Sequence, residues 1–344
     1  MDHRSLGRTG VKVSPLCLGA MMFGAIGNPD HEDSAQIIHA ALDAGINFVD
    51  TADVYSAGES ETIVGKALLG RRDDVVLATK FHGAMGSDPN QRGNSRRWII
   101  TECENSLRRL QTDWIDLYQV HRPDAHTTDI DETLGALSDL VHQGKIRYFG
   151  SSTFPAEEIV ESHWVAETRN RERFRTEQPP YSIFARGIEK DVLPTCQRYG
   201  MGVIPWSPLN GGWLTGKYRR GEAAPADARF VRRGTFDPNN PDNARKLDLV
   251  EELLKVAADA GTSLTNLALA FVLRHPAVSS AIIGPRTMTQ LTDQLPSVDV
   301  TLDDEILDRI DAIVPPGSNV SAGDAGYQSP WLAAWRRRRP ATKG

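Results

Sequence analysis

Short apolar runs alternate with longer segments of helical periodicity along the whole chain. The runs are typical of strands because they are rich in Val, Ile, Leu and aromatic residues. The segments between them, such as 31–45, 58–70, 95–110 and 129–145, repeat apolar residues at helical spacing and end near glycine or basic residues. The eight predicted strands are "PLCLGAM" at 15, "INFVD" at 46, "VVLATK" at 75, "IDLYQVH" at 115, "IRYFGSS" at 146, "FRTEQ" at 174, "GVIPWS" at 202 and "SSAIIG" at 279.

This alternation predicts an α/β fold. Strands and helices at such spacing form right-handed βαβ units with a parallel sheet, and eight units in a chain of this length favour a single (β/α)8 TIM barrel. Two additions are expected: an N-terminal hairpin that closes the barrel bottom and a long functional loop after the seventh strand. The composition predicts one domain over 1–325, followed by a basic tail over 326–344.

Composition narrows the classes of partner. The chain has 344 residues, 40% of them hydrophobic, and a formal net charge of −6. This charge argues against nucleic acid or acidic membranes as general partners, since both attract basic surfaces. The run of four arginines at 336–339 is expected to be a solvated part of the tail.

Cysteine usage and hydropathy predict a cytoplasmic protein. Cys17, Cys103 and Cys196 lie far apart and form no CxxC pair, which favours a reducing compartment and no structural zinc. The N-terminal stretch carries no long apolar segment, and no run approaches the roughly 18 apolar residues of a membrane span.

Candidate chemistry lies at the carboxyl ends of the predicted strands, where the βα loops of a barrel gather. The second strand ends at Asp50 with Tyr55 in its loop, the third ends at Lys80, and the fourth ends at His121. Each residue alone fits a turn, a core cap or a hydrogen-bonded core position. As a set they form a chemical unit, because a phenol of pKa about 10 needs a nearby cation to work at neutral pH. Lys80 can supply that cation, Asp50 can hold Lys80, and His121 can orient a carbonyl oxygen.

Three motifs, "GINFVDTADVYSAGESE", the "ATK" strand and "IDLYQVHRPD", carry a resemblance to a known family. With the segments "RSLGRTGVKVSPLCLGAMMFG" and "DEILDRIDAIV", they make the chain similar to aldo-keto reductases over nearly its whole length. The resemblance implies that Tyr55 donates a proton, that Lys80 and Asp50 tune it, and that His121 orients the substrate. It also implies hydride transfer from NADPH to an aldehyde or ketone, which yields an alcohol.

The resemblance further implies the residues that hold NADPH, and no GxGxxG loop follows the first strand to favour a Rossmann site. Ser152 and Gln178 match positions that hold the nicotinamide carboxamide. Thr153 stands where the family usually has Asn, so that contact is expected to be weaker or to run through water. Trp206 matches an aromatic residue that stacks on the nicotinamide. The other expected cofactor residues are Met22, Asp50, Ser207, Pro208, Leu209, Gly212, Lys217, Arg229, Gly284, Arg286, Gln290, Asp293 and Gln294.

Arg286 predicts the choice of cofactor. It lies in "IIGPRTMTQLTDQL", where a strand leads into a helix whose N-terminus favours an anion. Its planar fork of donors suits the adenosine 2′-phosphate, which predicts NADPH over NADH. Gln290, Asp293 and Gln294 follow at helical spacing to reach the adenosine, and Gln294 replaces the Asn that the family more often has.

Two other functions stay open. A metal-dependent barrel hydrolase could use His121, Asp124 and His126, although an HxH pair on an early strand is missing. An NADPH-binding, redox-sensing regulatory subunit is the second, because potassium-channel beta subunits also resemble this chain. The intact set of four reactive residues favours a free enzyme.

The substrate is expected to be a small carbonyl compound in a mostly apolar pocket. The predicted pocket residues are Met22, Phe23, Tyr55, Phe81, His82 and His121, with Tyr327 or Trp331 from the tail as further candidates. The sequence does not choose between aromatic, aliphatic and sugar carbonyls, and it does not give the oligomeric state.

Overall fold

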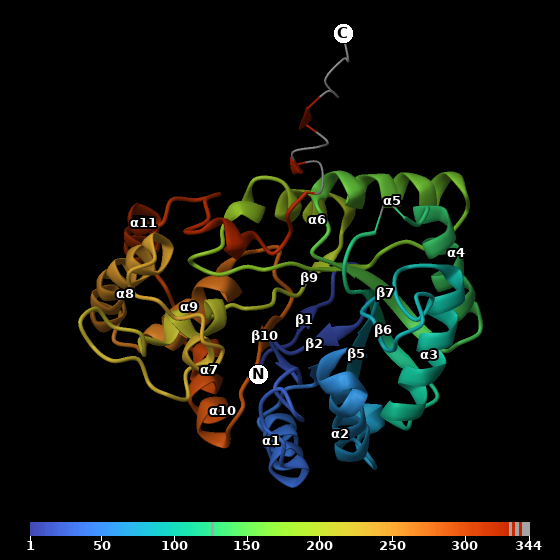
Figure 1. Ribbon diagram of the computed structural model, residues 1–344, viewed down its shortest axis with the longest axis horizontal. Helices are drawn as coiled ribbons and strands as arrows, with labels where there is room; N and C mark the ends of the chain where they lie inside the picture. The colour runs from blue at the N-terminus through green and yellow to red at the C-terminus, as the bar shows by residue number, and fades with distance from the viewer. Residues whose placement is uncertain (125–126, 330–331, 334–336, 339–344) are drawn as a thin grey trace.

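Eight parallel strands form the centre of the molecule (Figure 1). The structure is a computed structural model that describes residues 1–124, 127–329, 332–333 and 337–338. All eight predicted runs form strands in it, and they pair in the order β10-β3-β4-β5-β6-β7-β8-β9. The strands are β3 (Leu16–Gly19), β4 (Phe48–Asp50), β5 (Val76–Phe81), β6 (Ile115–Val120), β7 (Ile146–Ser152), β8 (Thr176–Gln178), β9 (Gly202–Val203) and β10 (Ala281–Ile283).

The sheet closes on itself between its first and last members. The amide of Ser279 donates to the carbonyl of Val203 (2.8 Å), and the amide of Ile282 donates to the carbonyl of Pro205 (2.9 Å). These bonds join the β10 side to the β9 side, so the eight strands form the predicted barrel. Closure leaves no free sheet edge and gathers all strand ends at one mouth.

Helices surround the sheet (Figure 1). Two of the longer ones, α1 and α3, begin at side chains that cap free amides: Asp30 accepts from Glu32 and Asp33, and Ser95 accepts from Trp98. The helices are α1 (His31–Asp43), α2 (Glu59–Ala67), α3 (Arg96–Leu110), α4 (Ile130–His142), α5 (Ala156–Thr168), α6 (Val192–Tyr199), α7 (Arg229–Arg232), α8 (Pro241–Asp259), α9 (Leu264–Arg274), α10 (Met288–Gln294) and α11 (Asp304–Ile313). Short 3-10 turns are η1 (Tyr55–Gly58), η2 (Arg72–Asp74), η3 (Gly187–Glu189), η4 (Asn210–Thr215), η5 (Leu295–Val298) and η6 (Ala322–Ala325).

Within the described residues, no single helix has the length and apolar character to cross a membrane. The α8–α9 pair meets both criteria only when it is joined across an 84° bend.

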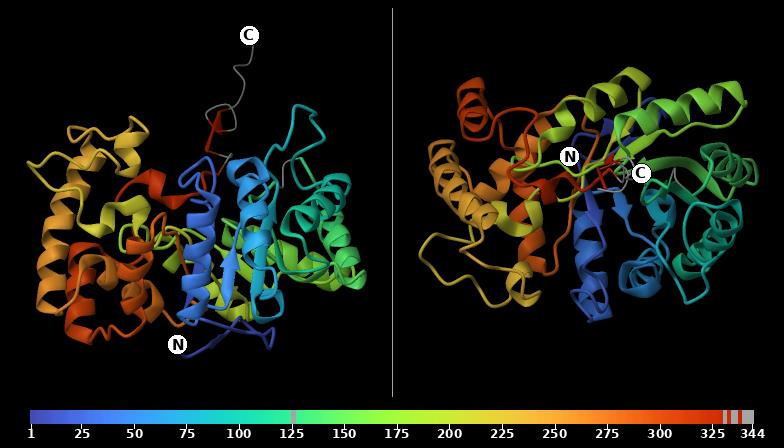
Figure 2. Two further views of the ribbon diagram at one scale, coloured as in Figure 1. Left: turned by 90° about the horizontal axis from the view of Figure 1, so that it is seen from below. Right: turned by 45° about the horizontal axis from the view of Figure 1, so that its top comes forward.

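The N-terminal hairpin closes one end of the barrel. Strands β1 (Arg4–Ser5) and β2 (Lys12–Val13) pair antiparallel, as predicted. Leu6 and Val13 are buried in a small core inside the barrel, together with Cys17, Phe48, Ala78, Leu117, Ile204 and Ile282. Figure 2 shows the hairpin, in dark blue, at the opposite end of the molecule from the gold loop that precedes α8. The hairpin end is therefore structural, and the site lies at the other end.

Two long segments cover the open end. The loop after β9 contains η4 and α7 before it reaches α8. The segment around η6 is held against this loop by a buried polar cluster. In the cluster, Lys246 Nζ donates to Asp324 Oδ1 (2.6 Å) and to Asn210 Oδ1 (3.0 Å). Much of the predicted basic tail, including Trp331, lies outside the described residues.

Candidate active site

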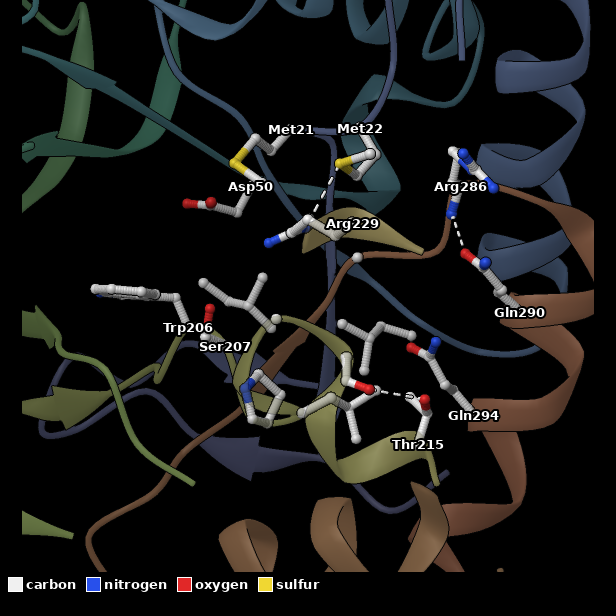
Figure 3. Close-up of a pocket in the computed structure, with 18 of the residues that line it drawn as sticks. Met21, Met22, Asp50, Trp206, Ser207, Thr215, Arg229, Arg286, Gln290 and Gln294 are labelled. Carbon is white, nitrogen blue, oxygen red and sulfur yellow. Dashed lines mark hydrogen bonds between the residues drawn. The ribbon is translucent and has the colours of Figure 1, made fainter. Parts of the chain in front are cut away.

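A cavity of about 680 Å³ opens at the carboxyl ends of the strands (Figure 3). Its walls come from the segment after β3, from the ends of β4 and β6 to β8, from the loop after β9, and from the β10–α10 corner. Predicted residues that line it are Met22, Asp50, Tyr55, His121, Ser152, Gln178, Trp206, Ser207, Pro208, Leu209, Gly212, Lys217, Arg229, Gly284, Arg286, Gln290, Asp293 and Gln294. The residues that the sequence assigned to one site therefore lie around one cavity in the structure.

At the reactive end, Lys80 lies completely buried between Asp50 and Tyr55. Its Nζ donates to Asp50 Oδ1 (2.6 Å) and to the Thr51 carbonyl (2.7 Å), and it lies 3.4 Å from the Tyr55 hydroxyl. The same ammonium is 4.9 Å from the centre of the Tyr55 ring. The ion pair and these hydrogen bonds offset much of the cost of burying the charge.

Two glutamine side chains hold the second oxygen of Asp50. Gln119 Nε2 donates to Asp50 Oδ2 (3.1 Å), and Gln178 Nε2 donates to the same oxygen (2.9 Å). Gln119 was missed by sequence reasoning, although a glutamine inside the apolar run "IDLYQVH" signals a buried polar contact. Gln178 lines the cavity, but in this structure it serves Asp50, and its contact with a carboxamide stays a prediction.

Burial and neighbouring charges together set the protonation of the reactive groups. It raises the pKa of the Tyr55 phenol above its ordinary value, and the nearby Lys80 charge only partly reverses that rise. Burial lowers the pKa of Lys80, but Asp50 and Tyr55 more than compensate, so its pKa is raised. Burial and the Lys80 charge hold the pKa of His121 well below its usual value. At neutral pH the site therefore contains a protonated phenol, an ammonium and a neutral imidazole, whose ring centre lies 5.7 Å from that of Tyr55.

The loop that carries Tyr55 is strained and anchored from behind. Ser56 and Ala57 have positive φ values of 49° and 55°, which non-glycine residues rarely adopt. The anchor lies four residues after Ala57, in α2, where buried Glu61 accepts from Arg109 Nε (2.6 Å). Arg109 Nη2 also donates to buried Glu102 on α3 (2.5 Å). These buried ion pairs fix the position of the loop against α3.

Asp53 faces away from the reactive set. It is completely buried, and burial together with Glu61 and Glu102 raises its pKa well above the usual range. Its Oδ1 accepts from the Val54 amide (2.6 Å), while no described residue bonds to its Oδ2. Of the two acids in the "VDTAD" motif, Asp50 bonds the Lys80 ammonium through its carboxylate, whereas Asp53 bonds Lys80 only through its backbone amide, which donates to the Lys80 carbonyl (3.1 Å).

At the end of β7, Thr153 takes an unusual position. Its φ of 61° is left-handed, which suits Asn better than a β-branched residue. Its Oγ1 accepts from Trp206 Nε1 (3.3 Å) and from Arg122 Nη1 (3.3 Å), so it orients the ring and the guanidinium. Ser152 lines the cavity and Thr153 does not. Thr153 therefore affects the cavity only through the side chains that it positions.

The other end of the cavity is strongly basic. Lys217, Arg229 and Arg286 line it as predicted, and the sequence reasoning missed two further lining residues, Arg232 and Arg233. Burial lowers the pKa of Lys217, Asp227 opposes the shift, and Arg229, Arg286 and Arg232 add to it. Arg286 Nη2 donates to Asp227 Oδ2 (2.8 Å), the acid that also lines this region. This excess of positive charge matches a ligand with several phosphate charges.

The β10–α10 corner combines polar groups that bond one another with one buried acceptor that bonds no described residue. Gln290 Oε1 accepts from the Arg286 amide (2.8 Å), and Thr287 caps the helix by accepting from the Gln290 amide (3.3 Å). Gln294 lines the cavity, and its buried Oε1 has no hydrogen-bond partner among the described residues. Figure 3 shows Arg286, Gln290 and Gln294 on the wall that faces Trp206 and Ser207 across the cavity. Basic charge and an unpartnered acceptor together fit an adenine nucleotide that carries phosphates.

The structure corrects part of the predicted substrate pocket. Phe23 and Phe81 are completely buried in the outer core, and neither is among the residues that line the cavity. Phe81 packs instead on Tyr118, with ring centres 4.8 Å apart. His82 is also outside the lining set, and its Nδ1 pairs with Asn94 Oδ1 (2.9 Å).

Two further candidates fall outside the cavity wall. Tyr327 contacts Glu158 (3.5 Å) instead of lining the cavity. Within the described residues, no group of three or more His, Cys, Asp or Glu could hold a metal ion, and His126 lies outside them.

Comparison with known proteins identifies the family. The family model described as "Aldo/keto reductase family" matches residues 15–315, and the chain belongs to this family of oxidoreductases, whose members generally use NAD(P)H. The chain is 41% identical over 347 residues to the uncharacterized oxidoreductase YrpG of Bacillus subtilis (strain 168), which covers 97% of this chain and 100% of that protein. It is 38% identical over 329 residues to a probable voltage-gated potassium channel subunit beta of Oryza sativa subsp. japonica, covering 91% and 97% respectively. It is also 38% identical over 298 residues to the aldo-keto reductase YhdN of Bacillus subtilis (strain 168), and the alignment covers 85% of this chain and 87% of that protein.

Proposed function

We propose that this protein reduces an aldehyde or ketone to an alcohol with NADPH. The observation that carries the proposal is the buried Lys80, which bonds Asp50 and lies 3.4 Å from the Tyr55 hydroxyl at the wall of the cavity. Bound NADPH would supply the hydride. The chain's own residues then need to hold the carbonyl, polarise it and deliver one proton to its oxygen.

Tyr55 is the proposed proton donor. Its raised pKa keeps the phenol protonated at neutral pH, so the proton is present when the substrate binds. The Lys80 ammonium stabilises the phenolate that forms as the proton leaves. His121 is neutral because its pKa is held low, and one of its ring nitrogens can donate a hydrogen bond to the carbonyl oxygen. Asp50 and its two glutamine partners keep the ammonium in place.

The basic end of the cavity is the proposed site of the NADPH phosphates. Lys217, Arg229 and Arg286 would hold them, and Gln294 would accept a hydrogen bond from the adenine amino group. Ser152 and Trp206 line the far end, where the nicotinamide would lie beside Tyr55. We further propose the cytoplasm as the location, since Cys17, Cys103 and Cys196 are free and buried.

The test compares wild-type protein with Tyr55→Phe in a panel of aldehydes and ketones, followed by NADPH absorbance. The variant keeps the ring and loses the proton, so kcat should fall about 10²- to 10⁴-fold. NADPH affinity, measured by fluorescence titration, should change little. Wild-type kcat in the variant, with chemistry limiting the rate, would show that Tyr55 is not the donor.

A regulatory role is the second candidate, because a relative at 38% identity is named as a probable voltage-gated potassium channel subunit beta. In that case the same cavity would bind NADPH as a redox signal. Tight NADPH binding without turnover of any carbonyl in the panel would favour this role.

A further inference from the structure

Arg122 is a charged residue of the cavity that the proposed chemistry does not use. It follows His121 at the end of β6 and lines the cavity beside Tyr55, far along the chain from the basic residues after β9. Its Nη1 donates to the His121 carbonyl (2.6 Å) and to Thr153 Oγ1 (3.3 Å). The donors on Nε and Nη2 have no partner in the described part of the chain.

The guanidinium is held in place from several sides. The buried Asn94 side chain donates to the Arg122 carbonyl (3.1 Å) and fixes the backbone. The guanidinium carbon lies 5.9 Å from the centre of the Trp206 ring, and Thr153, in its strained left-handed conformation, bonds both side chains. A positioned cation loses little conformational freedom when it binds a ligand, so this arrangement favours recognition.

No acid in the described residues neutralises Arg122 by an ion pair. Burial lowers the pKa of Arg122, and two acidic groups oppose that shift, the Tyr55 phenol and the Glu177 carboxyl group. The Tyr55 phenol is protonated because its pKa is raised, and burial raises the pKa of Glu177 to about 8, so that carboxyl group is mostly neutral at pH 7. By contrast, Lys80 pairs with Asp50, and Arg286 pairs with Asp227. A half-buried, unpaired guanidinium beside the reactive groups is costly unless a ligand brings an anion.

We propose that Arg122 binds a carboxylate on the substrate, so that the preferred substrates are carbonyl compounds that also carry an acid group. The inference rests on the proposed reductase function and adds the substrate class. The planar fork of the Nε and Nη2 donors matches the two oxygens of a carboxylate. The position of Arg122 next to His121 puts this anchor on the side where the carbonyl would be held, and the phosphate-binding cations lie at the other end of the cavity.

The experiment compares 4-formylbenzoate with its methyl ester, two aldehydes that differ in charge at one end. Wild-type protein with NADPH should show a kcat/KM for the acid about 10- to 100-fold above that for the ester, since a charge-assisted pair contributes about 1.5 to 3 kcal/mol. Arg122→Gln should lower this acid-to-ester ratio at least tenfold, mostly through KM. Arg122→Lys, which retains a cation without the fork, should keep part of the preference.

Three results separate the proposal from its rivals. Equal kcat/KM values for acid and ester in the wild type would overturn it. A parallel loss for both substrates in Arg122→Gln, with weaker NADPH binding by fluorescence titration, would assign Arg122 to the cofactor instead. If neither aldehyde is turned over, the reductase function is wrong, and calorimetric titration of benzoate then tests the anion site by itself. Benzoate binding to the wild type that is lost in Arg122→Gln would support the anion site. No benzoate binding to either protein would reject it.

Discussion

The two ends of the cavity are built from different kinds of structure. At the reactive end, Asp50, Lys80 and Gln119 lie on the adjacent strands β4, β5 and β6, and Lys80 and Gln119 are direct partners in the strand register. At the basic end, Lys217 and Arg229 come from the long loop after β9, which turns through several left-handed residues. Gly212 is one of these, with φ 103°, and an added Cβ would lie 3.0 Å from Lys217 Nζ.

This difference shows how completely each end is organised before a ligand arrives. The carboxylate of Asp50 accepts from Lys80, Gln119 and Gln178, so the charged pair of Asp50 and Lys80 at the reactive end is satisfied by the protein's own residues. At the basic end, burial lowers the pKa of Lys217, and Arg229 and Arg286 lower it further because like charges repel. A buried polar network on strands is rigid, whereas a cluster of cations on a loop needs an anion to complete it.

The largest expected effect concerns the strand-borne end. Lys80→Met removes the cation that stabilises the Tyr55 phenolate, and kcat/KM for carbonyl reduction should fall about 10²- to 10⁴-fold. NADPH affinity should change by less than about threefold, because the proposed phosphate contacts lie on the loop. Stopped-flow reduction assays and fluorescence titration measure the two quantities.

The control for Lys80→Met addresses the buried charge that it leaves on Asp50. An uncompensated buried carboxylate destabilises a protein by about 3 to 5 kcal/mol. The Asp50→Asn/Lys80→Met double variant removes both charges and should recover much of the thermal stability without recovering activity. Recovery of activity together with stability would show that Lys80 has only a structural role. The reactive end would then no longer differ from the basic end as a preorganised catalytic network.

The next prediction concerns Glu177, a buried acid on β8. Burial raises the pKa of Glu177 to about 8 in the folded state, against an unfolded value of about 4.3. The folded state therefore binds more protons between these values, and the free energy of unfolding should fall as pH rises from 5 to 8. The expected loss is about 3 kcal/mol, and Glu177→Gln should flatten the profile.

Urea unfolding at pH 5, 6, 7 and 8 measures this effect. The exposed Glu167→Gln on α5 is the matched control, and it should leave the pH profile as in the wild type. If Glu177→Gln keeps the wild-type slope, Glu177 is ionised in the fold, and it would then neutralise Arg122 as well.

Much of the fold could be predicted from local patterns. The eight strands have buried faces rich in Leu, Val and Ile, and capping residues such as Asp30 and Ser95 mark where helices begin. Phe23 and Phe81 show the limit of this reasoning. Phe81 directly follows the reactive Lys80 in the sequence, and Phe23 directly follows Met22, which lines the cavity. Successive side chains on a strand point to opposite faces, so Phe81 packs outside the barrel while Lys80 points inward.

The site residues that lie at strand ends could be predicted from the sequence more completely than the site residues that lie on loops. Asp50, Lys80 and His121 follow from strand ends alone, because a barrel brings those ends together. Gln119 and Arg122 were missed because their roles depend on contacts with residues 69 and 31 positions away along the chain. Arg232 and Arg233 were missed because the conformation of a long loop is set by tertiary contacts that no local pattern encodes.

The smallest expected effect concerns the loop-built end. Arg286→Ala should weaken NADPH binding about 10- to 100-fold and leave NADH binding nearly unchanged, since only NADPH carries the 2′-phosphate that the guanidinium would bind. In this structure Arg286 already pairs with Asp227, so the phosphate has to compete with a carboxylate for the same donors. Asp227→Asn is therefore the matched variant, and it should increase the preference for NADPH, most clearly at low salt. Titration of both cofactors at two salt concentrations measures the preference, and equal dissociation constants for NADPH and NADH in the wild type would contradict the assignment of Arg286.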